Sequence, residues 1–172
     1  MSTLKVDTIQ GKTTAGTVAI PGHVVQVVNV QDGEVASGTT TISYDDTIMQ
    51  NTEGVQFMTL SITPTSATNK LKIDVVGHFN HDGSNKILTV GLFQDSTADA
   101  LALMASFQAL SNCPLPISFT HFMTTGTTSA TTFKVRCGAD TSATVTFNGR
   151  DGTNRRGGGR YASSITITEI AQ

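Results

Sequence analysis

The sequence predicts an all-β fold, a jelly-roll sandwich of roughly eight to ten antiparallel strands. Three observations lead to this prediction. Charged residues make up only 14% of the 172-residue chain, and Thr, Val and Ile are abundant. Branched side chains of this kind pack well on a pleated sheet. Short runs of alternating or continuous apolar residues also recur along the chain, with Gly, Pro, Asn and Asp between them.

The alternation is clearest in the last third of the chain. Residues 131–138, 144–149 and 163–170 are predicted strands, separated by Gly-rich loops. In the last of them, polar Thr166 and Thr168 alternate with apolar residues, so that one face is buried. We expect Ile165, Ile167 and Ile170 to form that buried face.

The first strands are predicted from the N-terminal side of the chain. Residues 24–28 form a nearly continuous apolar run, which suggests a strand buried on both faces or at an interface. Residues 39–44 alternate and end at a turn signal, Asp45-Asp46. Residues 55–62 alternate next, with Met58, Leu60 and Ile62 on one face, and Pro64 ends the run.

The middle of the chain contains three more predicted strands and one ambiguous segment. The strands are residues 71–76, 87–93 and 116–123. Residues 97–108 fit a helix and a strand equally well: their apolar residues follow a Ser/Thr cap candidate at helical spacing, but the stretch is short and lies between predicted strands. For each large aromatic residue, a place in the core is the expected one, although some could line an interface: Phe57, Phe79, Phe119, Phe122, Phe133, Phe147 and Tyr161.

Pro21-Gly22 is a strong break, and it divides the chain into two predicted parts. Residues 1–22 are a leader with too little apolar surface for a core of its own. Residues 23–172 are the jelly-roll domain. We expect the leader to dock on another protein through its apolar residues: Leu4, Val6, Ile9, Val18 and Ile20.

Charge and hydropathy exclude several classes of function. The net charge is −2, so no general attraction to nucleic acid is expected. No apolar run is long enough to span a membrane, and the N-terminus lacks the apolar core of a signal peptide. We therefore expect synthesis in a host cytoplasm. Cys113 and Cys137 have no metal-ligand spacing, and free, buried thiols are expected.

An ordered set of short motifs resembles the C-terminal domain of tail-fibre and other virion structural proteins of tailed bacteriophages and prophages. The motifs cover essentially the whole chain: residues 4–9, 20–25, 25–28, 42–47, 50–54, 57–60, 62–64, 92–97, 126–136, 147–149 and 163–170. The resemblance implies a jelly roll like the tumour-necrosis-factor and complement-collagen head domains. It also implies a homotrimer on the virion exterior, attached through residues 1–22 to another virion protein.

The resemblance leaves two roles open. The leading one is a non-enzymatic tail-fibre or receptor-binding head that contacts host surface polysaccharide. Known fibres usually carry a long shaft before such a head, whereas only residues 1–22 precede it here. That departure favours a compact head, a spike tip or the alternative role, a decoration protein on the phage capsid.

The segment 148–160 is the strongest candidate for a binding site. It places four arginines in a Gly-rich loop, where guanidinium groups could bind carboxylate or phosphate groups of a polysaccharide. The loop could equally pair with Asp45, Asp46 or Glu53 of a neighbouring subunit, or simply be a solvated hairpin. The candidate contact residues are Asn148, Arg150, Arg155, Arg156 and Arg160.

Two histidines are weak metal candidates. His78 and His81 lie three apart and would face opposite sides of a strand, so they chelate together only if the chain turns there. We favour a polar loop over residues 78–83, and a half-buried or interface position for His121. No catalytic constellation, cofactor motif or phosphate-binding loop is recognisable, and no enzyme activity is expected.

Overall fold

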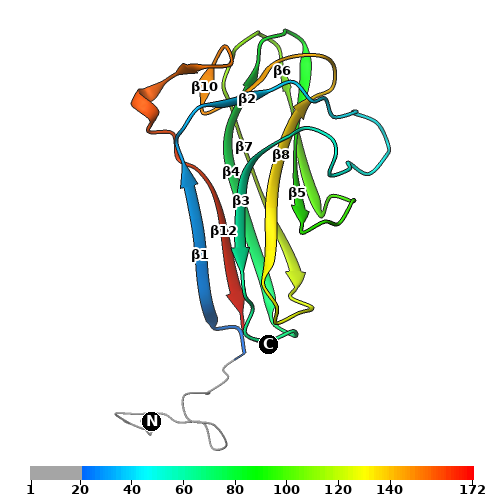
Figure 1. Ribbon diagram of the computed structural model, residues 1–172, viewed down its shortest axis with the longest axis vertical. Coiled ribbons are helices and arrows are strands. Elements are labelled where there is room, and N and C mark those ends of the chain that lie inside the picture. Colours follow the sequence, from blue (N-terminus) through cyan, green and yellow to red (C-terminus); the bar gives the residue numbers. More distant parts are fainter. Residues whose placement is uncertain (1–20) are drawn as a thin grey trace, which may run out of the picture.

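The computed structural model describes residues 21–172, which fold into β-strands and one short 3-10 turn (Figure 1). The long strands are β1 (Val24–Asp32), β3 (Val55–Ile62), β4 (Lys70–His81), β5 (Lys86–Gln94), β6 (Ala102–Gln108), β7 (Leu115–Thr124), β8 (Thr131–Ala139) and β12 (Ser163–Ile170). The short elements are β2 (Ala36–Gly38), β9 (Val145–Phe147), β10 (Gly149–Arg150), β11 (Asn154–Arg155) and η1 (Gly157–Gly159).

The pairing of the long strands is that of a jelly roll. Taken in chain order, the first strand pairs with the last, β1 with β12, and the second with the seventh, β3 with β8. The third pairs with the sixth, β4 with β7, and the fourth with the fifth, β5 with β6. All these pairs are antiparallel, as in a long hairpin rolled into two sheets. One sheet contains β1, β12, β4 and β7, and the other has the order β3-β8-β5-β6. The predicted fold class is confirmed.

Most predicted strands are present, one ambiguous segment is resolved, and two segments differ from expectation. The ambiguous segment 97–108 contains a strand, β6, that begins at Ala102 after a turn. The strand predicted over residues 39–44 was wrong, since these residues belong to a long loop between β2 and β3. Residues 78–81 were expected in a polar loop, but they continue β4 because Phe79 and His81 pair with β9.

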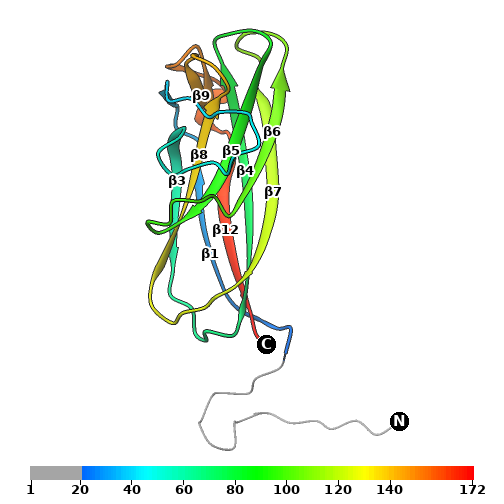
Figure 2. The ribbon, with the colours of Figure 1, turned by 90° about the vertical axis from the view of Figure 1, so that its right-hand side faces the viewer.

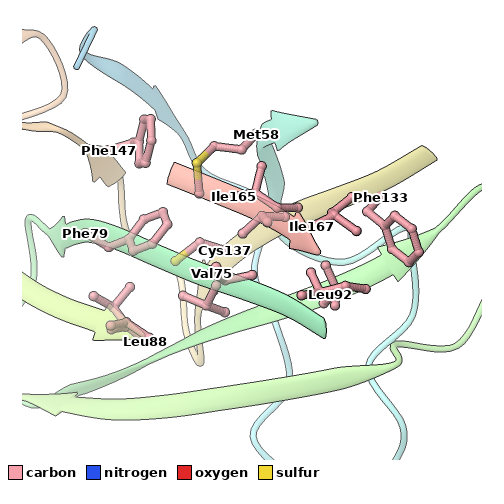
Figure 3. Packing of buried hydrophobic residues seen from close by; sticks show 14 of the residues in the cluster. Met58, Val75, Phe79, Leu88, Leu92, Phe133, Cys137, Phe147, Ile165 and Ile167 are labelled. Atoms are coloured by element: carbon pink, nitrogen blue, oxygen red, sulfur yellow. The ribbon is translucent and has the colours of Figure 1, made fainter. Parts of the chain in front are cut away.

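The core lies between the two sheets (Figure 3) and is built from the inward-facing residues of both. Leu71, Ile73 and Val75 of β4 are buried as predicted, while Lys72 and Asp74 face outward. Three aromatic rings pack together within this core. The ring of Phe57 lies 5.7 Å from Phe79 and 5.4 Å from Phe147, and Phe79 lies 5.3 Å from Phe147. Aromatic rings prefer such offset and tilted arrangements.

Three expectations about burial need correction. In β12 the third inward position belongs to Glu169, which is fully buried, and not to Ile170. The expected burial of both faces of residues 24–28 is not seen in the single chain, because β1 is an edge strand and Val27 is 56% exposed. The expected core position of Phe122 was also wrong, since its ring points away from the core and is 60% exposed.

A second, smaller cluster lies on the outer face of the β3-β8-β5-β6 sheet. The loop of residues 39–54 folds back over this face and buries Ile42 and Met49 beside Phe93. This close approach depends on glycine, because a Cβ at Gly91 would lie 2.5 Å from Met49 Sδ and a Cβ at Gly138 would lie 2.7 Å from Ile42 Cγ1. The loop is therefore a packed part of the fold.

Candidate functional site

The Arg loop, residues 149–160, lies at the end of the sandwich opposite the start of β1 and the end of β12 (Figures 1 and 2). It contains the small hairpin of β10 and β11 and the turn η1. All four of its arginines are exposed: Arg150, Arg155, Arg156 and Arg160. The structure thus groups on one loop the arginines that the sequence singled out.

Asn148 anchors the loop to the body of the protein. Its side chain is buried, and its amide donates hydrogen bonds to the carbonyl oxygens of Asp32 at 2.7 Å and Glu34 at 3.3 Å. The hydroxyl of Ser163 donates to Asn148 Oδ1 at 2.5 Å. The φ angle of Asn148 is +54°, a left-handed conformation that Asn tolerates better than most residues. The expectation that Asn148 contacts a receptor or subunit does not fit this burial, and the residue positions the loop instead.

Two further contacts attach the loop to β4. The amide of Asn80 donates a hydrogen bond of 2.7 Å to the carbonyl oxygen of Gly149. Where the chain leaves the loop, the ring of Tyr161 packs against the ring of His78, with centroids 4.7 Å apart. The Arg loop is therefore fixed at both ends by groups that belong to the sandwich.

Acidic partners for the arginines are few. Arg155 Nη2 lies 3.8 Å from a carboxylate oxygen of Glu34, and Arg150 Nε lies 3.7 Å from one of Asp151. Within residues 21–172, the only other ion pair joins Lys72 to Asp74, so Arg156 and Arg160 have no acidic partner among the described residues. Exposed pairs at such distances contribute little to stability. The loop consequently presents positive charge to the solvent.

The acidic groups that could have met the Arg loop of a neighbour are mostly occupied within their own loop. The carboxylate of Glu53 accepts hydrogen bonds from the backbone N–H groups of Ser43 and Gln50. The carboxylate of Asp45 accepts from the N–H and hydroxyl of Thr47. These contacts close the 39–54 loop, which leaves Asp46 as the acidic group there with no hydrogen bond or ion pair to any residue of the described part of the chain.

The two metal candidates do not form a metal site together. The ring of His78 lies against Tyr161, whereas His81 is fully buried next to Gln108, whose side chain hydrogen-bonds the His81 backbone. Nowhere in residues 21–172 do three His, Cys, Asp or Glu side chains come close enough to hold a metal ion. As the spacing predicted, the two rings project from opposite faces of β4 and are therefore kept apart.

Burial changes the titration of several groups near this end and elsewhere. It lowers the pKa of His78, of His81 and of the half-buried His121. Both ring nitrogens of His81 are buried, and neither has a hydrogen-bond partner within residues 21–172. Both cysteines are free. Cys137 is buried, which raises the pKa of its thiol well above the usual value, whereas Cys113 is exposed, contrary to expectation.

Sequence reasoning missed two residues of this site. Glu34 lies in the turn after β1 and supplies the counter-charge of Arg155, and Tyr161 was assigned only to the core or an interface. No sequence signal links residue 34 to residue 155, because the jelly-roll pairing of β1 with β12 brings them together. The predicted docking residues lie outside the described part of the chain: Leu4, Val6, Ile9, Val18 and Ile20. None of the described residues forms a helix able to cross a membrane.

Comparisons with known proteins show similarity of fold alone. No protein-family model matches the chain, and no curated protein matches it. Among solved structures, Eiger TNF from S. frugiperda is similar, with 8% identity over 89% of this chain and 95% of that chain and a TM-score of 0.48. The Gt strain of infectious bursal disease virus gives 11% identity over 100% of this chain and 42% of that one, with a TM-score of 0.41.

A third similar structure is dimeric latent PorU from Porphyromonas gingivalis, with 7% identity over 91% of this chain and 14% of that one and a TM-score of 0.42. The chain therefore spans less than half of the viral chain and a small part of PorU. At such identities only a fold is shared. The protein is a jelly-roll β-sandwich, as its own strand pairing shows.

Proposed function

We propose that this protein is a non-enzymatic structural protein of a bacteriophage virion: a homotrimeric head domain that attaches to the particle through residues 1–22. Its leading role is that of a tail-fibre or receptor-binding head. The proposal is supported by the ordered motifs that resemble such proteins and by the jelly-roll fold. One surface of the sandwich adds the observation that carries the assembly part of the proposal.

Residues 100–133 contain no Asp, Glu, Lys or Arg, and they build β6 and β7. Each of these strands pairs on one side only, so β6 is a free edge of one sheet and β7 a free edge of the other. The two edges lie side by side along one flank of the sandwich (Figure 2). Large apolar side chains are exposed on this flank: Leu103, Met104, Phe107, Leu110 and Phe122.

Soluble proteins usually protect free sheet edges with charged residues, bulges or prolines. Here Pro114 and Pro116 protect only the start of β7, and the rest of both edges carries uncharged side chains. Exposed large apolar side chains beside two uncharged free edges favour a protein interface. We call this surface the uncharged flank, and we assign it to contact with another copy of the chain.

The part of the outer face of the β1–β12–β4–β7 sheet that lies over β1 and β12, away from Phe122 on β7, is a suitable counterpart on the second copy. Its outward side chains on β1 and β12 are uncharged and include Asn29, Thr166 and Thr168. On β4, Lys72 is paired with Asp74 at 2.7 Å, and Lys70 Nζ donates a hydrogen bond of 2.7 Å to Thr124 Oγ1. Covering this face would keep the Lys72–Asp74 pair intact, whereas Lys70 would keep only the neutral hydroxyl of Thr124 as its partner among the described residues. A contact of a flank with a different surface is heterologous and can close into a ring, which is compatible with a trimer.

Light scattering after size exclusion tests the assembly. The 172-residue chain should have three times the monomer mass of 18.1 kDa. The double variant F107D/F122D should be monomeric, because it places two charges on the uncharged flank. Y44D adds a charge at another exposed aromatic residue, 61% accessible and outside the flank, and should remain trimeric. A monomeric wild-type protein would contradict the proposed assembly.

Labelling of intact virions with an antibody to residues 23–172 tests the location. Signal at the tail or fibre tips would support the receptor-binding head. Signal spread over the phage head would instead support the second role, capsid decoration. Deletion of residues 1–22 should leave a folded trimer that no longer joins particles, and loss of the trimer in that variant would contradict the docking role.

A further inference from the structure

The Arg loop lies at the far end of the described structure from Pro21, the residue at which the predicted attachment segment joins the sandwich. The described chain begins at Pro21, beside Ala171, whose carbonyl accepts a hydrogen bond from the N–H of Gly22. The Arg loop lies at the opposite end of the long axis in both views (Figures 1 and 2). If the segment before Pro21 holds the virion, as proposed above, the loop points away from the particle.

The loop is also held in a defined shape before any ligand binds. Asn148 and Ser163 are fully buried and fix its base, and the packing of Tyr161 on His78 fixes its exit. The guanidinium of Arg155 lies against Gly159, where a Cβ atom would collide with it. Groups that are already ordered lose less conformational entropy on binding. The exposed guanidinium groups are thus presented from a fixed base.

The charge of the loop is incompletely balanced. Arg156 and Arg160 have no acidic partner among the described residues. The acid paired with Arg155 is Glu34, whose Oε1 lies 3.8 Å from Arg155 Nη2 and whose side chain is 77% exposed. Guanidinium groups bind carboxylate and phosphate oxygens through paired, charge-assisted hydrogen bonds. The surface is therefore suited to an anionic ligand, with Glu34 acting as an internal competitor.

A contact with a neighbouring subunit is less well supported. Of the three acids considered as partners, Asp45 and Glu53 have carboxylates engaged within the 39–54 loop, and only Asp46 has no hydrogen bond to a described residue. The uncharged flank of β6 and β7 already offers a subunit contact that does not involve the loop. These observations favour a ligand outside the trimer.

We infer that Arg155, Arg156 and Arg160 form a binding site for the carboxylate or phosphate groups of an anionic polysaccharide. This inference rests on the proposed function, because a host surface is where a loop facing away from the virion would meet such a polymer. Three copies in a trimer would add avidity to a weak site. Polymers that carry carboxylates and polymers that carry phosphates both present a pair of anionic oxygen atoms that a guanidinium group can bind.

Binding of purified full-length protein to immobilised polysaccharides tests the site. Polygalacturonic acid supplies carboxylates, a phosphorylated mannan supplies phosphates, and dextran is the uncharged control. Wild-type protein should bind one or both anionic polymers and not dextran. R156A/R160A should weaken binding at least about tenfold, since each charge-assisted contact is worth roughly that factor. E34Q should strengthen binding, because it removes the competitor of Arg155.

Two controls make the result specific. K134A removes one positive charge on β8, outside the loop, and should bind within about twofold of wild type if net charge alone has little effect. Light scattering on R156A/R160A should still give the wild-type mass. If R156A/R160A dissociates, the inference is overturned and the arginines make a subunit contact. If K134A and R156A/R160A lose binding equally, the inference is also overturned, because the attraction is then non-specific. Monomeric wild type would contradict the trimer but leave the per-chain binding comparison valid.

Discussion

The amide of Asn69 donates a hydrogen bond of 2.6 Å to Oε1 of Glu169, and both side chains are buried. The same carboxylate accepts hydrogen bonds from the backbone N–H and the hydroxyl of Thr65 and from the amide of Gln26. All of these donors are uncharged. Glu169 therefore joins β1, β12 and the turn between β3 and β4, and within residues 21–172 its charge is stabilised by hydrogen bonds from neutral donors.

Glu169 should make the protein sensitive to acid. Burial by itself raises the pKa of this carboxyl, but the bonds from Gln26, Asn69 and Thr65 outweigh burial and lower the pKa below its usual value. A carboxyl with a lowered pKa in the folded state stabilises the fold above its unfolded pKa, and that stability is lost as the pH falls through the folded pKa. The free energy of unfolding should therefore decrease as the pH is lowered below about 4.5.

The variant E169Q tests this role. At pH 7 it should lower the free energy of unfolding by about 1–3 kcal/mol, because its amide N–H₂ would replace an acceptor among donors. It should also lose part of the acid dependence. Urea unfolding at pH 7 and at pH 4 measures both effects. E34Q, at an exposed carboxylate, is the control and should leave stability unchanged. An E169Q protein as stable as wild type at pH 7 would contradict the role.

His81 should contribute a second acid dependence, at higher pH. Burial lowers the pKa of its ring below the usual value, and this exceeds the opposing effect of the nearby backbone of Lys86 and Gly83. The unfolded chain then binds the proton more tightly, so stability should fall as the pH drops below about 6.5. H81L should show a smaller drop in unfolding free energy between pH 7 and pH 5. The residual drop belongs to groups such as His78 and His121, and an unchanged slope would refute the assignment.

Asn148 should matter for stability more than its place beside an exposed loop suggests. N148A would leave Ser163 and two carbonyl groups without their buried partner, and it would place Ala at a positive φ. We expect a loss of about 2–4 kcal/mol of unfolding free energy from these two effects together. N154A, which removes an exposed hydrogen bond to Asp151, should cost little. Chemical denaturation of both variants gives the comparison, and equal stabilities would be inconsistent with an anchoring role.

Gly91 and Met49 should be energetically coupled. G91A places a methyl group where Met49 Sδ lies, and such overpacking typically costs about 1–3 kcal/mol. M49A removes the clash, so the double variant should lose less stability than the sum of the two single variants. A double-mutant cycle measured by urea unfolding provides the test. Strict additivity would show that the 39–54 loop does not pack on β5 as described.

The sequence alone determined the fold class and most of the strands. Alternation in residues 71–76, 116–123 and 163–170 reports directly which face of a strand is buried, because this period is a local property of a pleated chain. It failed where burial depends on a distant partner. Residue 170 is apolar but faces outward, since Glu169 finds its donors on β1 and near β4. Residues 39–44 alternate like a strand, yet they pair with no strand among the described residues, and Ile42 packs on a sheet face instead.

The sequence also marked the four arginines and the low charge of the chain, but only the tertiary structure decided what they can do. Pairing of β1 with β12 brings Glu34 to Arg155, although the two residues are more than a hundred positions apart in the sequence. The same pairing buries Asn148 beneath the loop, whereas the sequence had predicted a contact residue there. The same rolling of the chain puts β6 and β7 on one flank and the Arg loop at the end away from Pro21. Local patterning fixes which side of a strand is buried, whereas the position of a loop or an edge depends on long-range pairing.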